Sequence, residues 1–303
     1  MTTLNSRDPL AVSVTEAIRT GDLPALSALL AEHPELASTG ITESEDPDRA
    51  GTRSLLHIVT DWPGHYPRAA QVVATLVAAG ADPGVRFVGA HEETPLHWAA
   101  SSNDVPAIDA LLAAGADIEA PGAVLGGGTP LADACGFGQW RAARRLVEHG
   151  AHVLLDDAAA LGLMDRVEAF LAASTPPSAE EIDHAFWHAC HGGQLAVARH
   201  LHGLGADLDR IGYDSMTPLD VARAQDADAV VAWLVEQGAK ASARPKAEEK
   251  TEAEAETDGD GDGDLEVEGD ADGDVDGDGD FDLEAEAEAD VDGRGGRGGE
   301  RAE

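Results

Sequence analysis

The stretch of sequence that decides the fold reads Thr94-Pro95-Leu96-His97-Trp98-Ala99-Ala100, and it continues through Ile108, Leu111 and Leu112 to Gly115-Ala116-Asp117. A threonine can cap the first turn of a helix, and a proline directly after it stands where no backbone N–H is needed. The isoleucine and leucines are spaced as the apolar stripe of a second helix, which the glycine can end in a left-handed conformation. The stretch therefore predicts two helices followed by an extended connection.

The same pattern returns along the chain. Its first helix begins again near Thr129, His184 and Thr217. A recurrence of this length is typical of stacked repeats, in which each unit buries its apolar face against the next. Seven units are expected, at residues 11–40, 51–83, 93–120, 128–153, 154–175, 183–210 and 216–240. Residues 1–10 are expected to be a flexible N-terminus.

These residues resemble the ankyrin repeat, whose hallmark is Thr-Pro-Leu-His, a pair of small residues, a leucine-rich second helix and Gly-Ala-Asp. The resemblance implies an all-α solenoid of stacked helix pairs with short hairpin-like fingers over residues 11–240. It also implies a non-enzymatic scaffold for protein–protein interaction. In that family the partner contacts the concave surface, which the fingers and the exposed side of the first helices form.

Several units depart from the motif. The second carries about five extra residues at 61–68, and the fifth lacks both Thr-Pro and the terminal glycine, so its finger is expected to be clipped. Ala132, Trp187 and Asp220 replace the motif histidine in the fourth, sixth and seventh units. These units are expected to lose the side-chain bond that the histidine makes within its turn, and to be locally looser. The stack is still expected to be continuous.

Residues 241–303 differ sharply in composition from the rest of the 303-residue chain. They hold 25 Asp and Glu against six Lys and Arg, in a chain of net charge -38. So few large apolar residues cannot offset the entropy of ordering, and a disordered acidic tail is expected. Two of its Asp-rich runs begin like a calcium loop, but the twelfth position is Gly269 or Leu283 instead of Glu. Weak, non-specific binding of divalent cations is the expectation, and a role as decoy or autoinhibitory segment for basic partners is an alternative.

Composition also bears on partners and compartment. No dense stripe of Lys and Arg is present, which argues against a nucleic-acid partner. No run of 18 apolar residues is present, which argues against a membrane span. Cys135 and Cys190 are the only cysteines, so no disulfide framework is expected. A monomer in the cytoplasm, without a cofactor, is expected.

Histidines offer the strongest alternative to a binding protein. The densest group lies in the sixth unit and consists of His184, His188, His191, His200 and His202. His184 and His188 are spaced like the ligands of a His-Glu-x-x-His zinc motif, but Ala185 stands where the general-base Glu belongs. Alignment with the repeat instead places His184 at a helix cap and Cys190 at a small buried position. A metal-dependent or other enzyme using the region from His184 to His202 stays the alternative, and no catalytic, cofactor or metal residue is assigned.

The resemblance also selects candidate partner-binding residues. The fingers are expected around residues 86–92, 123–127 and 212–215, and Ser102 marks the exposed end of a first helix, with which Trp62 and Phe137 align. Exposed aromatic side chains often dominate the affinity of an interface. The candidates are Trp62, Arg86, Phe87, His91, Ser101, Val124, Leu125, Phe137, His191 and Tyr213. The alternative is that these rings pack against their own loops.

Overall fold

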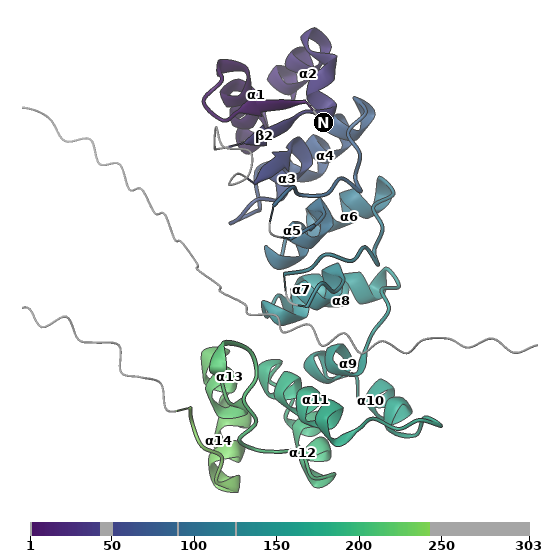
Figure 1. Ribbon diagram of the computed structural model, residues 1–303, viewed down its shortest axis with the longest axis vertical. Coiled ribbons are helices and arrows are strands. Elements are labelled where there is room, and N and C mark those ends of the chain that lie inside the picture. The colour runs from purple at the N-terminus through teal and green to yellow at the C-terminus, as the bar shows by residue number, and fades with distance from the viewer. Residues whose placement is uncertain (1, 43–50, 90, 125, 243–303) are drawn as a thin grey trace, which may run out of the picture. The chain divides into compact units, whose positions relative to one another are not determined.

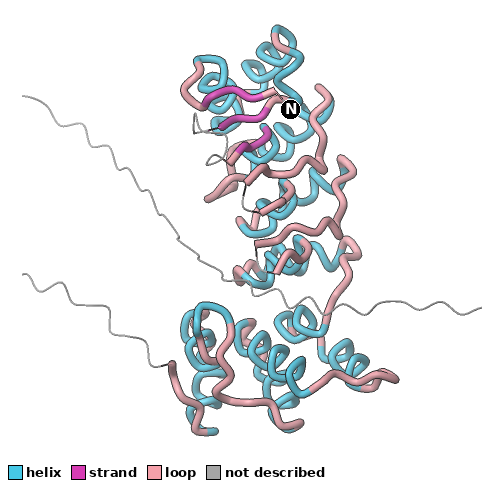
Figure 2. The backbone as a smooth tube through the Cα atoms, viewed as in Figure 1, coloured by secondary structure: helices cyan, strands magenta, loops and turns pink. Residues whose placement is uncertain are grey.

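The computed structural model of the 303-residue chain describes residues 2–42, 51–89, 91–124 and 126–242. The candidate contact Leu125 and almost all of the predicted acidic tail lie outside these residues. Within them the structure is mostly helical, as Figure 2 shows, and the prediction of stacked helix pairs is confirmed.

Seven helix pairs follow one another in the described residues (Figure 1). They are α1 (Pro9–Thr20) and α2 (Leu23–Glu32), α3 (Leu55–Thr60) and α4 (Ala69–Ala78), α5 (Pro95–Ser101) and α6 (Val105–Ala113), α7 (Pro130–Gly136) and α8 (Trp140–Glu148), α9 (Leu155–Leu161) and α10 (Met164–Leu171), α11 (Ala179–His191) and α12 (Leu195–Gly203), and α13 (Pro218–Ala224) and α14 (Asp228–Gln237). Two short 3-10 helices are η1 (Pro34–Ser38) and η2 (Tyr213–Ser215). The first helix of each pair packs against the first helices of its neighbours.

Capping residues set the ends of these helices. The side chain of Thr94 and that of His97 bond reciprocally to the backbone at the start of α5, and Pro95 is its first residue. The Asp104 carboxylate accepts from the Ala107 N–H at 3.1 Å and so caps α6. Gly115 follows α6 with φ +93°, which a residue with a side chain rarely adopts. The capping residues thus lie where the motif predicts them.

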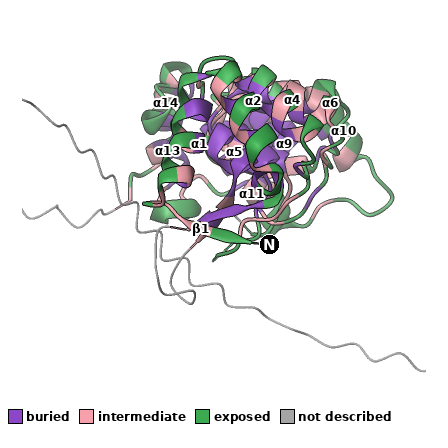
Figure 3. Cartoon of the chain, turned by 90° about the horizontal axis from the view of Figure 1, so that it is seen from above, coloured by how far each residue is buried: buried purple, intermediate pink, exposed green. Residues whose placement is uncertain are grey.

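The core runs through the middle of the stack, between first and second helices (Figure 3). Ala99 and Ala100 are completely buried, and their small size lets α5 approach its neighbours closely. Ile108 and Leu111 supply the buried stripe of α6. Each unit therefore depends on the next unit to cover its apolar face.

Residues 3–10 form β1 and lead into α1, so the expectation of a flexible N-terminus at residues 1–10 is wrong for these residues. Strands β1 (Thr3–Asn5), β2 (Gly40–Thr42) and β3 (Thr52–Ser54) form a sheet in the order β1-β2-β3, with β1 parallel and β3 antiparallel to β2. The Gly40 N–H donates to the Thr2 carbonyl at 2.9 Å. The Asp8 carboxylate accepts from the Leu10 N–H at 2.8 Å and caps α1. Backbone pairing and this cap hold the segment in place.

The fifth unit changes how the stack continues. Only residues 149–154 separate α8 from α9, whereas residues 114–129 separate α6 from α7, so the fifth finger is clipped as expected. From α9 onward the pairs follow one another sideways in Figure 1 instead of downward. As a result Trp140, in the fourth unit, lies with its ring centroid 5.1 Å from that of His191, in the sixth. The turn brings together units that a straight stack would separate.

Candidate interaction surface

Two first helices, α3 and α5, are each joined to the next unit by a buried histidine, His57 and His97 respectively. The Ser54 N–H donates to Nδ1 of His57 at 3.3 Å, which places the proton on Nε2, and Nε2 lies 3.2 Å from the Glu93 carbonyl. His97 repeats the arrangement, with Nε2 at 3.4 Å from the Gly128 carbonyl. Burial lowers the pKa of each ring to about 4, so both are neutral at pH 7. Glu93 and Gly128 each lie just before the first helix of the following unit. The bond from the histidine therefore fixes the end of the finger that leads into that helix.

Other side chains take over part of this role where the histidine is replaced. Trp187 Nε1 donates at 2.9 Å to the carbonyl of Met216, which again precedes the next first turn. The Asp220 carboxylate accepts from the Thr217 N–H at 3.1 Å and from its hydroxyl at 2.8 Å. The expected loss of the turn bond is therefore wrong for the seventh unit, and the sixth keeps its bond to the neighbouring unit. Ala132, with a methyl side chain, makes neither bond.

Arg86 and Phe87, two of the candidate contacts, pack within the fingers. Arg86 Nη1 donates to the carbonyl of Glu92 at 2.7 Å and also to that of Pro121. The Phe87 ring lies against Trp98, with centroids 5.4 Å apart. Both side chains are half-buried. For Phe87 the alternative, a ring packed against its own loop, describes its position.

Four further candidates are at least partly accessible. His91 is exposed, Val124 and Ser101 are half-buried, and Tyr213 is 43% exposed. The Ser101 hydroxyl donates back to the Trp98 carbonyl at 3.1 Å, within its own helix. These residues lie on several fingers and on one first helix.

Two positions expected at the surface are buried. Ser102 is 9% exposed and its hydroxyl donates to the Thr60 carbonyl at 3.3 Å, so its assignment as an exposed reference position is wrong. His191 is 4% exposed and lies between Trp140 and Trp187, whose ring centroids are 5.1 and 5.3 Å away. A ring covered on both sides cannot be a surface contact, so His191 is corrected to a core residue.

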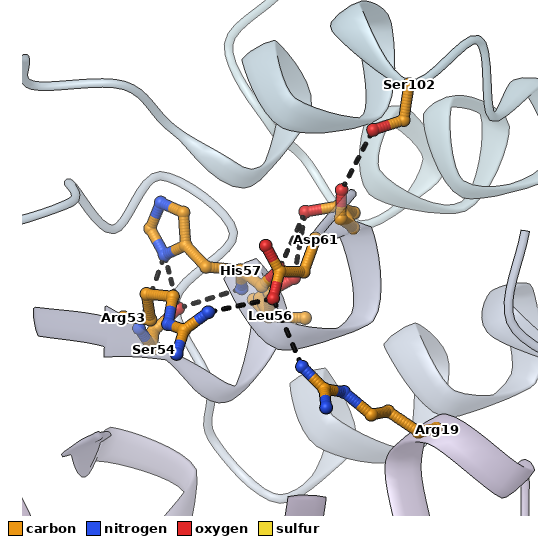
Figure 4. A network of polar contacts seen from close by, with 8 residues as sticks. Arg19, Arg53, Ser54, Leu56, His57, Asp61 and Ser102 are labelled. Carbon is orange, nitrogen blue, oxygen red and sulfur yellow. Dashed lines mark hydrogen bonds and ion pairs between the residues drawn. The ribbon is translucent and has the colours of Figure 1, made fainter. Parts of the chain in front are cut away.

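The inserted segment at residues 61–68 begins in a polar network (Figure 4). Asp61 accepts from Arg53 Nη1 at 2.8 Å, and from Arg19 Nη2 of the first unit at 3.4 Å. Burial raises the pKa of Asp61, and the two guanidinium groups counteract part of that shift. The carboxylate thus links the start of the insertion to two units.

The rest of the insertion is held from both sides. The His65 N–H donates to the Asp104 carboxylate of the third unit at 2.9 Å. Arg68 Nη1 donates to the Gly21 carbonyl of the first unit at 3.3 Å. Trp62 lies in the sequence between Asp61 and His65, which both bond to neighbouring residues, and it is 79% exposed. The exposed indole is therefore carried on a segment of the second unit that bonds to the first and third units. Phe137, at the end of α7, is 37% exposed.

A pocket of about 240 Å³ lies between α11 and the finger that precedes α13. Its lining residues are His184, Trp187, His188, Arg210, Ile211, Gly212 and Tyr213. Tyr213 stands edge-on to Trp187, with ring centroids 5.7 Å apart. Gly212 allows this closeness, because an added Cβ would lie 2.4 Å from Trp187 Nε1. Of this set only Tyr213 was predicted as a partner contact, whereas His184 and His188 were noted as part of the histidine-rich region.

The histidine-rich region does not form a ligand set in the part of the chain that the structure describes. No group of three His, Cys, Asp or Glu there is arranged to hold a metal ion. His188 and His191 belong to the ring cluster around Trp187, while His202 on α12 lies against Phe186 and Trp233. Cys135 and Cys190 are free thiols, and burial raises the pKa of both, which disfavours the reactive thiolate.

Among the helices of the described residues, each is too short or too polar to cross a lipid bilayer.

Comparison with known proteins places the repeat in a family. Residues 65–157 match the family model described as ankyrin repeats, in three copies. A solved structure, the human ASB11 ankyrin repeat domain, is similar at 26% identity over 62% of this chain and 85% of that chain, with a TM-score of 0.37. No curated protein matches the chain. The match runs from just before α4 into the first turn of α9, and this part of the chain consists of ankyrin repeats.

Proposed function

We propose that the protein is a non-enzymatic scaffold that binds a partner protein on the concave ankyrin surface and the adjoining rim that carries Trp62. The observation that supports this most is the exposure of Trp62, 79%, on a segment bonded to the first and third units. Tryptophan is the residue type most enriched among the few that dominate binding energy. A segment whose backbone is already held in place loses little backbone entropy when a partner covers it.

The acidic composition of the chain limits the kind of partner. A net charge of -38 attracts basic protein surfaces at low salt and repels phosphate backbones. We therefore expect a protein partner with a basic or neutral surface around its contact site. A monomer in the cytoplasm fits the two free, buried cysteines, Cys135 and Cys190, since neither is available to an intermolecular disulfide.

Affinity capture tests the proposal with matched variants of the full chain. Trp62→Ala should reduce recovery of the partner at least tenfold, which corresponds to about 1.4 kcal/mol of binding energy. Leu204→Ala removes another exposed apolar side chain, 51% exposed at the end of α12, and should leave recovery unchanged. If both variants lose partner recovery equally, or if neither loses any, Trp62 is not part of the interface. Recovery of no protein, together with turnover of small substrates, would favour the enzyme alternative.

A second role is proposed for residues 241–303, on the basis of their composition alone. Their 25 acidic residues can bind divalent cations weakly and compete with acidic ligands for basic partners. Deletion of this segment should change the affinity for a basic partner most at low salt, where screening is weakest. Unchanged affinity at low salt would leave the segment without a role in binding.

A further inference from the structure

Arg210 at the pocket beside α11 lacks a close acceptor. Its side chain is 22% exposed, and its only ion pair within the described residues is a 3.9 Å contact with Glu180, whose side chain is 78% exposed. No hydrogen bond from its guanidinium is present among those residues. By contrast, Arg145 donates to Asp109 at 2.6 Å. A guanidinium carries five N–H donors suited to a carboxylate, so a partly buried one without an acceptor is poised to receive a ligand.

His188 provides a second donor in the same pocket. The residue is 8% exposed, and its Nδ1 is sealed from solvent without a hydrogen-bond partner. Burial, with two histidines nearby, lowers its pKa to about 3, so the ring is neutral. A buried N–H without an acceptor is rarer than a buried unpaired acceptor, which favours the tautomer protonated on Nε2. Nε2 is then a donor on the ring edge that is not sealed.

The walls of the pocket are apolar and enclose little space. Trp187 and Tyr213 form two sides, and Ile211 is 55% exposed at the rim. The pocket of about 240 Å³ is smaller than the roughly 300–1,000 Å³ typical of small-molecule sites. Its size fits one side chain of a partner, and Trp187 Nε1 is already bonded to Met216, so the indole offers that side chain an apolar face.

The charge of the lining is positive. No Asp or Glu lines the pocket, although Asp156 acts electrostatically on Arg210 and Tyr213 from nearby. Burial raises the pKa of Asp156 to about 6, so Asp156 is mostly ionised at pH 7. Its negative charge then offsets part of the positive charge of Arg210. The Arg210 guanidinium and, in this tautomer, His188 Nε2 are nevertheless donors. A ligand with an anionic acceptor is complementary to these donors. The negative charge of Asp156 repels such a ligand and keeps the affinity of the pocket for it modest.

We propose that this pocket binds the carboxylate side chain of a partner protein, with the carboxylate facing Arg210 and His188 and an adjacent apolar group against Trp187 and Tyr213. The proposal rests on the proposed function for the source of the carboxylate. It adds a recognition element on the sixth and seventh units, separate from Trp62 on the second.

Nuclear magnetic resonance of the full chain tests the proposal, because its five tryptophan indoles are separate reporters. The probe is acetyl-Gly-Phe-Glu-Gly-amide, and the comparison is the same peptide with Gln in place of Glu. The glutamate peptide should shift the Trp187 indole signal saturably, with a dissociation constant of about 1 mM, and leave the Trp62 indole in place. The glutamine peptide should bind at least tenfold more weakly.

Variants of two arginines complete the test. Arg210→Gln should weaken the glutamate peptide at least tenfold, while Arg223→Gln, at an exposed arginine of α13, should not. Equal binding of both peptides, a Trp187 signal that does not shift, or unchanged binding to the Arg210→Gln protein would overturn the proposal. A peptide whose only carboxylate is its free C-terminus, binding tighter than the glutamate peptide, would contradict the assignment to a side chain. A partner captured equally by wild type and Arg210→Gln would remove this inference and leave the proposed function standing.

Discussion

Replacing His191 should make the stability of the protein less sensitive to acid. The ring is 4% exposed and Nδ1 has no partner, and burial lowers its pKa from 6.5 to about 4. The unfolded chain, with the ordinary pKa, binds a proton more readily than the folded protein below pH 6.5. Stability contributed by the neutral ring is therefore present above pH 6.5 and is lost progressively as pH falls toward 4.

The size of the effect follows from the two pKa values. At pH 5 the unfolded histidine is almost fully protonated, whereas the folded one is almost fully neutral. This pH lies about 1.5 units below the unfolded pKa of 6.5. At about 1.4 kcal/mol per unit, folding loses roughly 2 kcal/mol between pH 7 and pH 5 through this ring. His191→Phe and His191→Gln both remove the titration, and Phe also removes the unpaired ring nitrogen.

Urea unfolding of the full chain at pH 7 and pH 5, followed by circular dichroism, measures the difference. Both variants should lose roughly 2 kcal/mol less stability than wild type between the two pH values, whatever their stability at pH 7. Acids with raised pKa values, such as Asp61 and Asp156, change stability in the opposite direction. They are present in all three proteins and cancel in the comparison. Equal losses in wild type and both variants would refute a buried, neutral His191.

Three further outcomes test the packing. Gly192→Ala should destabilise the protein by about 1–3 kcal/mol in thermal unfolding, since its Cβ would lie 1.9 Å from the Ala160 carbonyl oxygen, whereas Gly203→Ala, with open space, should not. Asp220→Ala should cost about 1 kcal/mol in urea unfolding by removing the acceptor of the Thr217 N–H, one half of the capping box of α13, and an unchanged midpoint would contradict that. Both cysteines should react with a thiol reagent only as the chain unfolds, so rapid labelling of native protein would refute their burial.

The sequence was most informative where one unit determines its own structure. Thr94 and Pro95 predict the start of a helix from local chemistry, and Gly115 predicts the end of its partner helix. Helical spacing predicts the buried positions Ile108 and Leu111 in the same way. These features need only the neighbouring residues, and they were predicted correctly.

The misassigned residues depend on contacts between units. Ser102 is buried because the insertion of the preceding unit packs on it, with Gly64 so close that an added Cβ would lie 2.9 Å from the Ser102 Cβ. His191 is buried because the clipped fifth unit turns the stack and brings Trp140 onto it. Neither contact leaves a periodic signal in the sequence, so alignment of the repeats alone could not identify them.

The pocket beside α11 was missed for a similar reason. Arg210 and His188 lie on different elements, and they line one pocket only because the finger lies along the helix. The N-terminal strand was missed because three residues are too few to show the alternation of a strand, and its pairing with Gly40 is made by backbone groups. Distant pairings of this kind require the folded structure.

Site-specific photo-crosslinking in cells tests the central claim most directly. A photoreactive amino acid at position 62 of the full chain should crosslink to one defined protein, because that position is exposed on a fixed segment. The same amino acid at position 204, which is also exposed at the end of α12, should give no such product. A crosslinked partner from position 204 and none from position 62 would contradict the proposed interaction surface.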